Sequence, residues 1–269
     1  DVYKRQTLEA MKADASAYCR GLADTPDLSA EQIDALVAQA EERLSAIKFE
    51  TDWDAAFGNA DLVVECINEN PQEKTEFYTK LAGHLPERTV ILTDSSTMLP
   101  SMFAEATGRP DKYMSLHFGN QIWRNNMTEL MRHDGTDPEV FELAAQFAEA
   151  IGMVPLKLNR EQPGYILNSL LIPWFKAATS LVATGVCDAE TVDKCWELAT
   201  GADPGQTPFR KLDKIGLVLA RNILSMDPAA KDPASGLAKS VAMLNGYIDE
   251  GKTGIAAGEG FYKYESYDK

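Results

Sequence analysis

Apolar residues in the first 160 positions form short continuous runs that alternate with segments of helical periodicity. The runs are rich in valine, isoleucine and leucine, which predicts strands that are covered on both faces. Strands are predicted at residues 49–51, 61–67, 89–93, 112–117 and 154–158. Helices are predicted at residues 7–22, 29–47, 99–107 and 138–151, and from Pro71 onward. This alternation of strand and helix is typical of a parallel α/β sheet.

The pattern changes near residue 160, after which no convincing strand follows. Helices are predicted at residues 164–184, 188–200, 208–224 and 235–249. The first of them is apolar nearly all round, because Leu170, Leu171, Ile172, Trp174 and Phe175 cover most of its circumference. Such a helix suits a subunit interface. The sequence therefore predicts an α/β domain over residues 1–159 and an all-helical domain over residues 160–269.

Composition excludes several classes of protein. Of the 269 residues, 45% are apolar and 25% are charged, which is ordinary for a soluble globular protein. The net charge of −15 argues against a nucleic-acid partner, since phosphates require a basic surface. No apolar run approaches the ~18–20 residues of a membrane span, and no secretory signal opens the chain. Four cysteines without metal-like spacing indicate reduced thiols, no metal site and a cytoplasmic location.

Candidate catalytic chemistry lies between residues 93 and 168. His117 ends a predicted strand, where open α/β sheets project side chains into a ligand-binding cleft. Glu129 lies in a second apolar segment that is able to return beside it. A carboxylate that reaches an imidazole fixes its tautomer and stabilises its protonated form, as a general base requires. Ser96 and Asn168 are able to offer neutral hydrogen bonds to a substrate oxygen, so the group indicates a centre that moves a proton and a hydride.

Each of these residues also has an ordinary structural interpretation. A histidine at the end of a strand is often a satisfied structural residue. Ser96 is placed to cap the helix predicted after it, and Glu129 taken alone is typical of a solvated carboxylate. Asn168 is able to cap a helix or cross-link two domains. The residue types alone leave these alternatives open.

One expected motif is absent. A dinucleotide-binding sheet normally opens with a strand, a G-x-G-x-x-G turn and a helix whose N-terminus holds the pyrophosphate. No segment of the chain matches that pattern, and residues 1–6 lead directly into a helix. Either the protein is an α/β protein that binds no nucleotide, or its first strand, glycine loop and helix are missing from this sequence.

From about residue 60 to the C-terminus the chain carries a series of characteristic phrases. They include Asp61-Leu-Val-Val-Glu65, Asp94-Ser95-Ser96, Leu116-His117-Phe118, Pro163-Gly164-Tyr165-Ile166-Leu167-Asn168 and Gly258-Glu259-Gly260-Phe261-Tyr262. In order and spacing they resemble the L-3-hydroxyacyl-CoA dehydrogenases, including the 3-hydroxybutyryl-CoA enzymes. The resemblance implies a partial, N-terminally incomplete Rossmann-like sheet followed by an all-helical substrate and dimerisation domain. It also implies an enzyme of fatty acid β-oxidation.

The resemblance implies a role for each matching residue. His117 would take the proton from the C3 hydroxyl of a short-chain L-3-hydroxyacyl-CoA as the hydride leaves for NAD, and Glu129 would steady the imidazolium. Ser96 and Asn168 would bind the substrate oxygen. The positions that match cofactor contacts of the family are Glu69, Lys74, Ser96 and Asn120. A homodimer through the helical domain is also implied.

Departures from the family pattern keep the substrate open. Gly119 and Gln121 replace an aromatic residue and a proline after His117, and Asp94 replaces an asparagine. They are compatible with a different NAD-linked dehydrogenase that acts on a free hydroxy acid of the carnitine or sugar-acid type. The choice between NAD and NADP also stays open. Without the phosphate-binding turn, the chain as given is expected to bind NADH poorly, and a truncated chain without activity stays an alternative.

Overall fold

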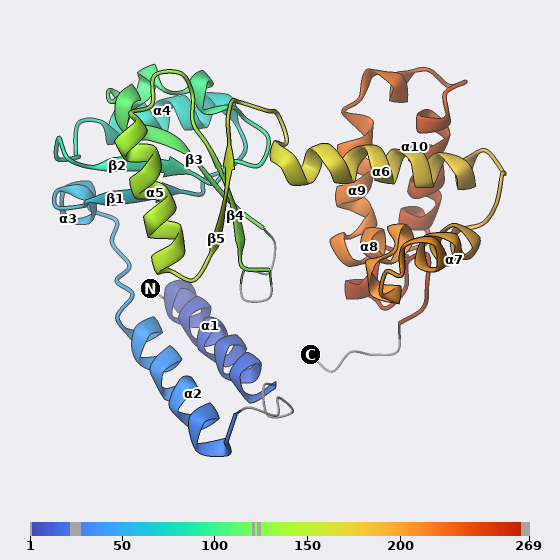
Figure 1. Ribbon diagram of the computed structural model, residues 1–269, viewed down its shortest axis with the longest axis horizontal. Helices are drawn as coiled ribbons and strands as arrows, with labels where there is room; N and C mark the ends of the chain where they lie inside the picture. The colour runs from blue at the N-terminus through green and yellow to red at the C-terminus, as the bar shows by residue number, and fades with distance from the viewer. Residues whose placement is uncertain (1, 22–27, 120–121, 123–124, 265–269) are drawn as a thin grey trace.

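The computed structural model describes residues 2–21, 28–119, 122 and 125–264. Figure 1 shows a sheet lobe, a helical lobe, and a hairpin of two helices that projects from the sheet lobe. The hairpin consists of α1 (Val2–Gly21) and α2 (Ala30–Ser45), which pack against each other. Ser29 and Gln32 form a capping box at the start of α2, as the sequence predicts.

The sheet has five strands in the order of the chain. They are β1 (Leu62–Glu65), β2 (Val90–Thr93), β3 (Tyr113–Phe118), β4 (Met127–Met131) and β5 (Val154–Leu158). Strands β1, β2 and β3 are parallel, β3 and β4 are antiparallel, and β4 and β5 are parallel. The expected Rossmann-like α/β sheet is thus confirmed as a mixed sheet. The strand predicted at residues 49–51 does not form, and that segment is an extended connection to α3 (Trp53–Phe57).

Helices cover both faces of the sheet, because successive strand residues point to opposite sides. On one face Leu92, Met114 and Leu116 pack against α5 (Pro138–Ala150). On the other face Ile91 and Tyr113 pack against α4 (Pro71–Leu81). Both faces are therefore buried, which explains the continuous apolar runs of the strands.

The helix predicted at residues 99–107 was wrong in type. The structure has 3-10 turns at Pro100–Met102 and Glu105–Thr107, followed by a third at Pro110–Lys112. Thr107 donates its hydroxyl to the carbonyl of Ala104, which competes with helical bonding, and Gly108 ends the turn in the left-handed region at φ 66°.

The helical lobe consists of five helices among the described residues. They are α6 (Tyr165–Ala183), α7 (Ala189–Thr200), α8 (Pro208–Ile215), α9 (Leu217–Ser225) and α10 (Gly236–Asp249). The single helix predicted at 208–224 is divided into α8 and α9 at Gly216, whose φ of 90° no helix accommodates. Phe209 and Leu212 before this break, and Leu217 and Leu224 after it, all join the core of the lobe.

The sequence analysis expected no apolar segment as long as a membrane span, and helix α6 corrects that expectation. By length and composition alone it would be able to cross a membrane. In the fold it is a helix of this lobe and packs closely on α10, where a β-carbon at Gly236 would lie 2.1 Å from Ser180 Oγ. Its N-terminus begins at the sheet lobe (Figure 1), so α6 connects the two lobes.

Candidate active site

The ends of β1, β2 and β3 meet at one edge of the sheet because these strands are parallel. Glu69 follows β1, Ser96 follows β2, and His117 is the penultimate residue of β3. The antiparallel register places His117 directly opposite Glu129 on β4. Cross-strand partners project to the same face of a sheet, so this pairing brings the imidazole and the carboxylate together.

The residue His117 is 6% exposed, and its ring contacts two polar groups. Its Nδ1 lies 3.1 Å from Glu129 Oε2, and its Nε2 lies 3.1 Å from Ser96 Oγ. An ionised carboxylate can only accept, so Nδ1 carries a proton and donates it to Glu129. In the neutral ring Nε2 is then an acceptor, and the Ser96 hydroxyl donates to it.

The Glu129 carboxylate is fully buried and joins the two lobes. While Oε2 faces His117, Oε1 accepts the backbone N–H groups of Ile166 at 2.8 Å and Leu167 at 2.9 Å. These N–H groups open α6, so the positive end of the helix dipole also faces the carboxylate. Glu129 therefore has donors from both lobes.

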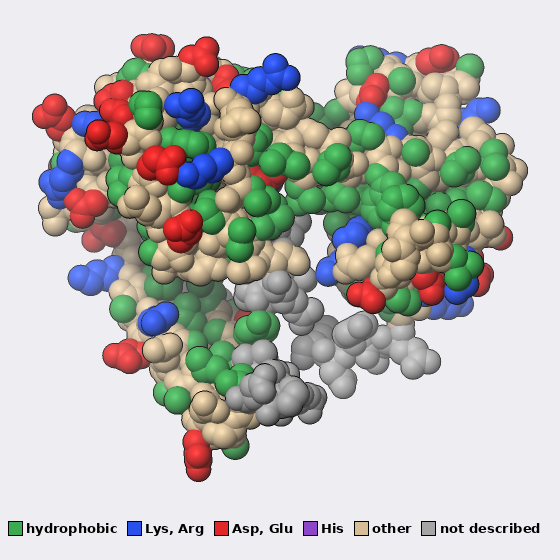
Figure 2. Space-filling view, in the orientation of Figure 1, with side chains coloured by type: hydrophobic (Ala, Val, Ile, Leu, Met, Phe, Trp, Pro, Cys, Tyr) green, Lys and Arg blue, Asp and Glu red, His purple; other side chains and the backbone are tan. Residues whose placement is uncertain are grey.

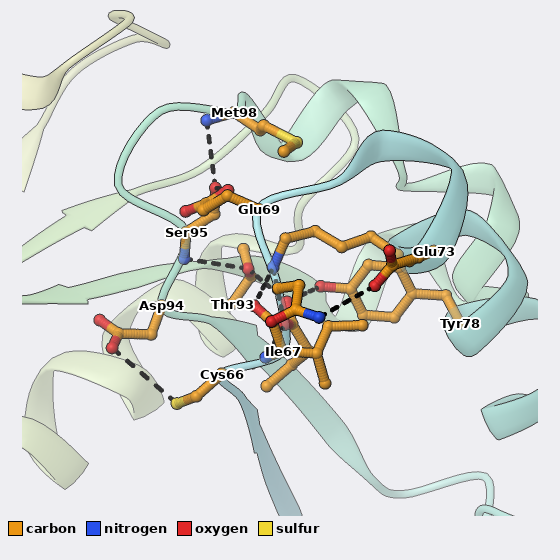
Figure 3. Close-up of polar contacts among 12 residues, drawn as sticks. Cys66, Ile67, Glu69, Glu73, Tyr78, Thr93, Asp94, Ser95 and Met98 are labelled. Carbon is orange, nitrogen blue, oxygen red and sulfur yellow. Dashed lines mark hydrogen bonds and ion pairs between the residues drawn. The ribbon is translucent and has the colours of Figure 1, made fainter. Parts of the chain in front are cut away.

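The turn that carries Ser96 is held by a second carboxylate. Glu69 Oε1 accepts the N–H of Ser96 at 2.7 Å, and Glu69 Oε2 accepts the Ser95 hydroxyl at 2.8 Å. The N–H of Met98 donates to Ser95 Oγ at 3.1 Å (Figure 3). Through these bonds the exposed Glu69 fixes the turn from which Ser96 reaches His117.

Two family models together match nearly the whole chain. Residues 4–162 match the model described as 3-hydroxyacyl-CoA dehydrogenase, NAD binding domain. Residues 164–264 match the model described as 3-hydroxyacyl-CoA dehydrogenase, C-terminal domain. This chain belongs to the 3-hydroxyacyl-CoA dehydrogenase family. It is accordingly an NAD-dependent oxidoreductase of that family.

Relatives and solved structures agree with the family. The chain is 33% identical to the mitochondrial hydroxyacyl-coenzyme A dehydrogenase of Homo sapiens over 84% of the chain and 70% of the human protein. It is 30% identical to a probable 3-hydroxybutyryl-CoA dehydrogenase of Deinococcus radiodurans over 82% of the chain and 77% of that protein. A solved diketoreductase is 40% identical with a TM-score of 0.83, over 97% of this chain and 87% of that one. The (S)-3-hydroxybutyryl-CoA dehydrogenase of Ralstonia eutropha, 23% identical with a TM-score of 0.72 over 94% and 85%, shares the fold.

The residues at the strand edge fit the family's cofactor in part. Glu69 is exposed beside Ser96, so hydroxyl groups of a ribose would meet acceptor oxygens there. Asn120, also expected at the cofactor, lies outside the described residues. Asn168 is half-buried in the first turn of α6, where its N–H donates to the carbonyl of Gly164 at 3.1 Å. Asn168 thus follows directly after Ile166 and Leu167, whose N–H groups bind Glu129.

Lys74 takes a different place from the one expected for a cofactor contact. Its side chain is 1% exposed, and its Nζ donates to Glu65 Oε1 at 2.7 Å and to the Ile67 carbonyl at 3.4 Å. Glu65 also accepts the hydroxyls of Tyr78 and Thr93, inside the sheet lobe (Figure 3). The structure therefore does not bring Lys74 to the exposed edge, and its cofactor role stays a prediction that this geometry does not favour.

The donors in the buried network around Glu65 stabilise the negative charge of this carboxylate. Burial by itself would raise the pKa of Glu65, but the bonds from Lys74, Tyr78, Thr93 and the N–H of Ile67 outweigh it and lower that pKa. The carboxylate is therefore held in its charged form. Thr93 Oγ1 accepts the N–H of Ser95 at 3.2 Å, which connects this network to the Ser96 turn.

Two further residues take part in the site. The sequence analysis named Asp94 only as a departure from the family pattern, and it missed the contact of Tyr165 with His117. Asp94 Oδ1 accepts the N–H of Phe118 at 2.8 Å, tying the end of β2 to the end of β3, and burial raises the pKa of this carboxyl. Tyr165 stacks its ring on His117 with centroids 4.4 Å apart and an interplanar angle of 19°. For Asp94 the departure from the family asparagine was a usable signal. For Tyr165 nothing in the local sequence indicated the stacking.

Proposed function

We propose that the protein reversibly oxidises the C3 hydroxyl of a short-chain L-3-hydroxyacyl-CoA, with His117 as the general base, in fatty acid β-oxidation. The observation that carries the proposal is the pair of contacts that the His117 ring makes, with Ser96 Oγ on one nitrogen and Glu129 Oε2 on the other, at 3.1 Å each. A base that is oriented by a carboxylate on its far side is the arrangement that proton abstraction requires.

The proposed proton transfer uses both nitrogens of the His117 ring. Nε2 of His117 accepts the proton of the substrate hydroxyl, while Nδ1–H stays bonded to Glu129. The buried carboxylate then faces an imidazolium, and its negative charge offsets the new positive charge at short range. Ser96 Oγ, now released from Nε2, donates to the oxygen of the substrate, and Asn168 supplies a second bond to the same oxygen.

When bound, NAD would supply the acceptor for the hydride that leaves C3. The residues proposed to hold it are the exposed Glu69 and the half-buried Ser96, at the carboxyl ends of β1 and β2. Glu69 would hold a ribose hydroxyl while it keeps the Ser96 turn in place. Ligands of open α/β sheets bind outside this edge, which supports the assignment.

The test is a comparison of two histidine variants in NADH-linked reduction of acetoacetyl-CoA. His117→Gln should lower kcat by about 10²- to 10⁴-fold, which is typical for loss of a positioned acid–base group. His84→Gln is the matched control, because His84 contacts Asp54 at the far side of the sheet lobe and should keep full activity. Retention of turnover in His117→Gln within about threefold of the control would refute the role of His117.

A second candidate function is reduction of a dicarbonyl compound that carries no CoA. It is supported by the diketoreductase, which is 40% identical, whereas the two acyl-CoA relatives are 33% and 30% identical. The same His117 and Ser96 would serve this reaction, because the carbonyl chemistry is unchanged. Values of kcat/KM for acetoacetyl-CoA and for ethyl acetoacetate separate the two, since the acyl-CoA proposal requires a clear preference for the thioester.

A homodimer through the helical lobe and a cytoplasmic location complete the proposal. Apolar side chains gather along α6 on the face shown in Figure 2. Leu170 of α6 is 67% exposed, and Leu198 of α7 is 73% exposed. Burial of such a surface against a second copy is the usual solution. The four free cysteines support a reducing compartment. Light scattering that finds only monomer at micromolar concentration would count against the dimer, and recovery from a secreted fraction would count against the location.

A further inference from the structure

Tyr165 has an unusual backbone for its residue type. Its φ is 55°, and it is the one residue other than glycine with a positive φ in the part of the chain that the structure describes. Residues with a β-carbon rarely adopt this region, and an aromatic side chain does so only when its surroundings hold it there. Gly164 before it has φ 78°. Two consecutive left-handed residues therefore turn the chain into α6.

The side chain of Tyr165 is what holds this turn. It is 1% exposed, its ring lies flat on the His117 ring, and its hydroxyl donates to the carbonyl of Ser95 at 2.7 Å. Burial raises the pKa of the phenol, so the hydroxyl stays protonated and remains a donor. One side chain of the helical lobe thus contacts both the imidazole and the turn that carries Ser96.

The backbone of the same turn serves the third group of the centre. Because the chain reverses at Gly164 and Tyr165, the N–H groups of Ile166 and Leu167 point at Glu129 Oε1. Residues 165–167 therefore contact all three parts of the centre: the imidazole, its carboxylate and the turn that carries Ser96.

We propose that Tyr165 is a positioning residue of this centre, which fixes the plane of the His117 ring and the place of Ser96. The inference rests on the proposed function only in taking His117 as the reacting base; the holding of the ring is a property of the chain alone. Helix α6 then completes the centre from the opposite lobe, and the His117 ring is ordered only while α6 is docked.

A merely structural role for Tyr165 makes a different prediction. Tyr165 also packs with Met131, Leu158 and Leu99 in a small apolar cluster between the lobes. If packing were its whole function, its replacement would lower the melting temperature only as a replacement of Leu158 is expected to do. The ring of His117 would then be unaffected.

The deciding measurement is the proton NMR signal of the His117 Nδ1–H, which requires neither cofactor nor substrate. The chain has three histidines, so the absence of one signal in His117→Gln assigns it. We expect a slowly exchanging signal in the parent protein and in Tyr165→Phe, which keeps the ring. In Tyr165→Leu the ring is lost, and exchange should be faster by about tenfold or more, as for a hydrogen bond opened to water. Leu158→Ala is the matched control for lost packing and should keep the slow signal.

Two further comparisons test the hydroxyl and the backbone. Tyr165→Phe removes the bond to Ser95, and kcat should fall about three- to tenfold with KM for NADH unchanged within about twofold. Tyr165→Gly should melt above Tyr165→Ala, because only glycine adopts φ 55° without strain.

The outcomes are separable. A slow Nδ1–H signal in Tyr165→Leu, with a drop in melting temperature like that of Leu158→Ala, would overturn the proposal. Full turnover by His117→Gln would instead overturn the proposed function, and the NMR comparison would still decide whether Tyr165 orders the ring.

Discussion

The buried pair of Lys74 and Glu65 allows a direct test of how the structure assigns Lys74. The two side chains are 1% and 0% exposed, and Nζ lies 2.7 Å from Oε1. In Lys74→Met, Glu65 would keep three donors, the hydroxyls of Tyr78 and Thr93 and the N–H of Ile67. Removing one partner of a buried pair costs ~3–5 kcal/mol, and the remaining donors place this variant near the lower end.

We therefore expect Lys74→Met to lower the free energy of unfolding by about 3 kcal/mol. At about 2–4 °C per kcal/mol for a chain of this size, the melting temperature should fall by roughly 6–12 °C. The double variant Glu65→Gln/Lys74→Met should recover most of this loss, because no buried charge is then left unpaired. Urea unfolding and thermal melting of the single and double variants measure the coupling between the two residues.

Lys80→Met is the matched control on the same helix. Lys80 is exposed and lies over the Trp53 ring at 3.9 Å, so its loss should cost no more than about 1 kcal/mol. If Lys74→Met were as mild as Lys80→Met, the reasoning from burial would be wrong. If it also raised KM for NADH about tenfold, equivalent to ~1.4 kcal/mol of binding, Lys74 would contact the cofactor as the family resemblance implies.

Three further variants or reactions test the electrostatics elsewhere in the chain. Burial raises the folded-state pKa of Asp94 above its unfolded value, so its charge costs stability as pH rises through that pKa. Asp94→Asn should therefore raise the melting temperature by about 2–4 °C at pH 8, with a gain that shrinks towards pH 4, and destabilisation at pH 8 would contradict this. Desolvation, followed by the nearby carboxylates of Asp94 and Glu65, raises the pKa of the Cys66 thiol to about 11. Cys66 and Cys195 are both exposed, so iodoacetamide at pH 8 should alkylate Cys66 about tenfold more slowly because less of it is thiolate. Equal rates measured by peptide mass spectrometry would be inconsistent with this. Asp213 accepts the N–H of Phe261 at 2.8 Å, and Asp213→Asn should weaken the docking of residues 258–264 by about 2 kcal/mol. Hydrogen exchange of the Phe261 amide measures that loss, and unchanged protection would argue against it.

The sequence predicted what depends on local pattern and on family phrases. Apolar runs located four of the five strands, and the approach of His117 to Glu129 followed from two apolar segments that pair side by side. The contact of Ser96 with His117 also agrees with their expected grouping. These features follow from strand periodicity and from strand ends that meet at one edge, which the residue order alone determines.

Other features depend on contacts between distant segments. Lysine and glutamate side chains are usually solvated. The burial of Lys74 against Glu65 could therefore not be inferred before β1 and α4 were placed relative to each other. The stacking of Tyr165 on His117 joins residues of two lobes. The break at Gly216, by contrast, had a signal, because glycine within a helical pattern often marks a C-terminus.

The two oxygens of Glu129 link the docking of the two lobes to the proposed proton transfer. Oε1 takes two N–H donors from α6 and Oε2 takes the Nδ1–H of His117, so every donor that the structure gives this buried charge comes from the base or from the opposite lobe. Separating the lobes would remove two charge-assisted bonds, at about 3 kcal/mol or more, and would leave the carboxylate dependent on His117 alone. An opened state at that cost is populated below ~1%. We therefore expect substrate to enter along the exposed edge beside Glu69 and Ser96 while α6 stays docked, so that proton transfer to His117 always occurs next to a carboxylate whose second oxygen is already satisfied.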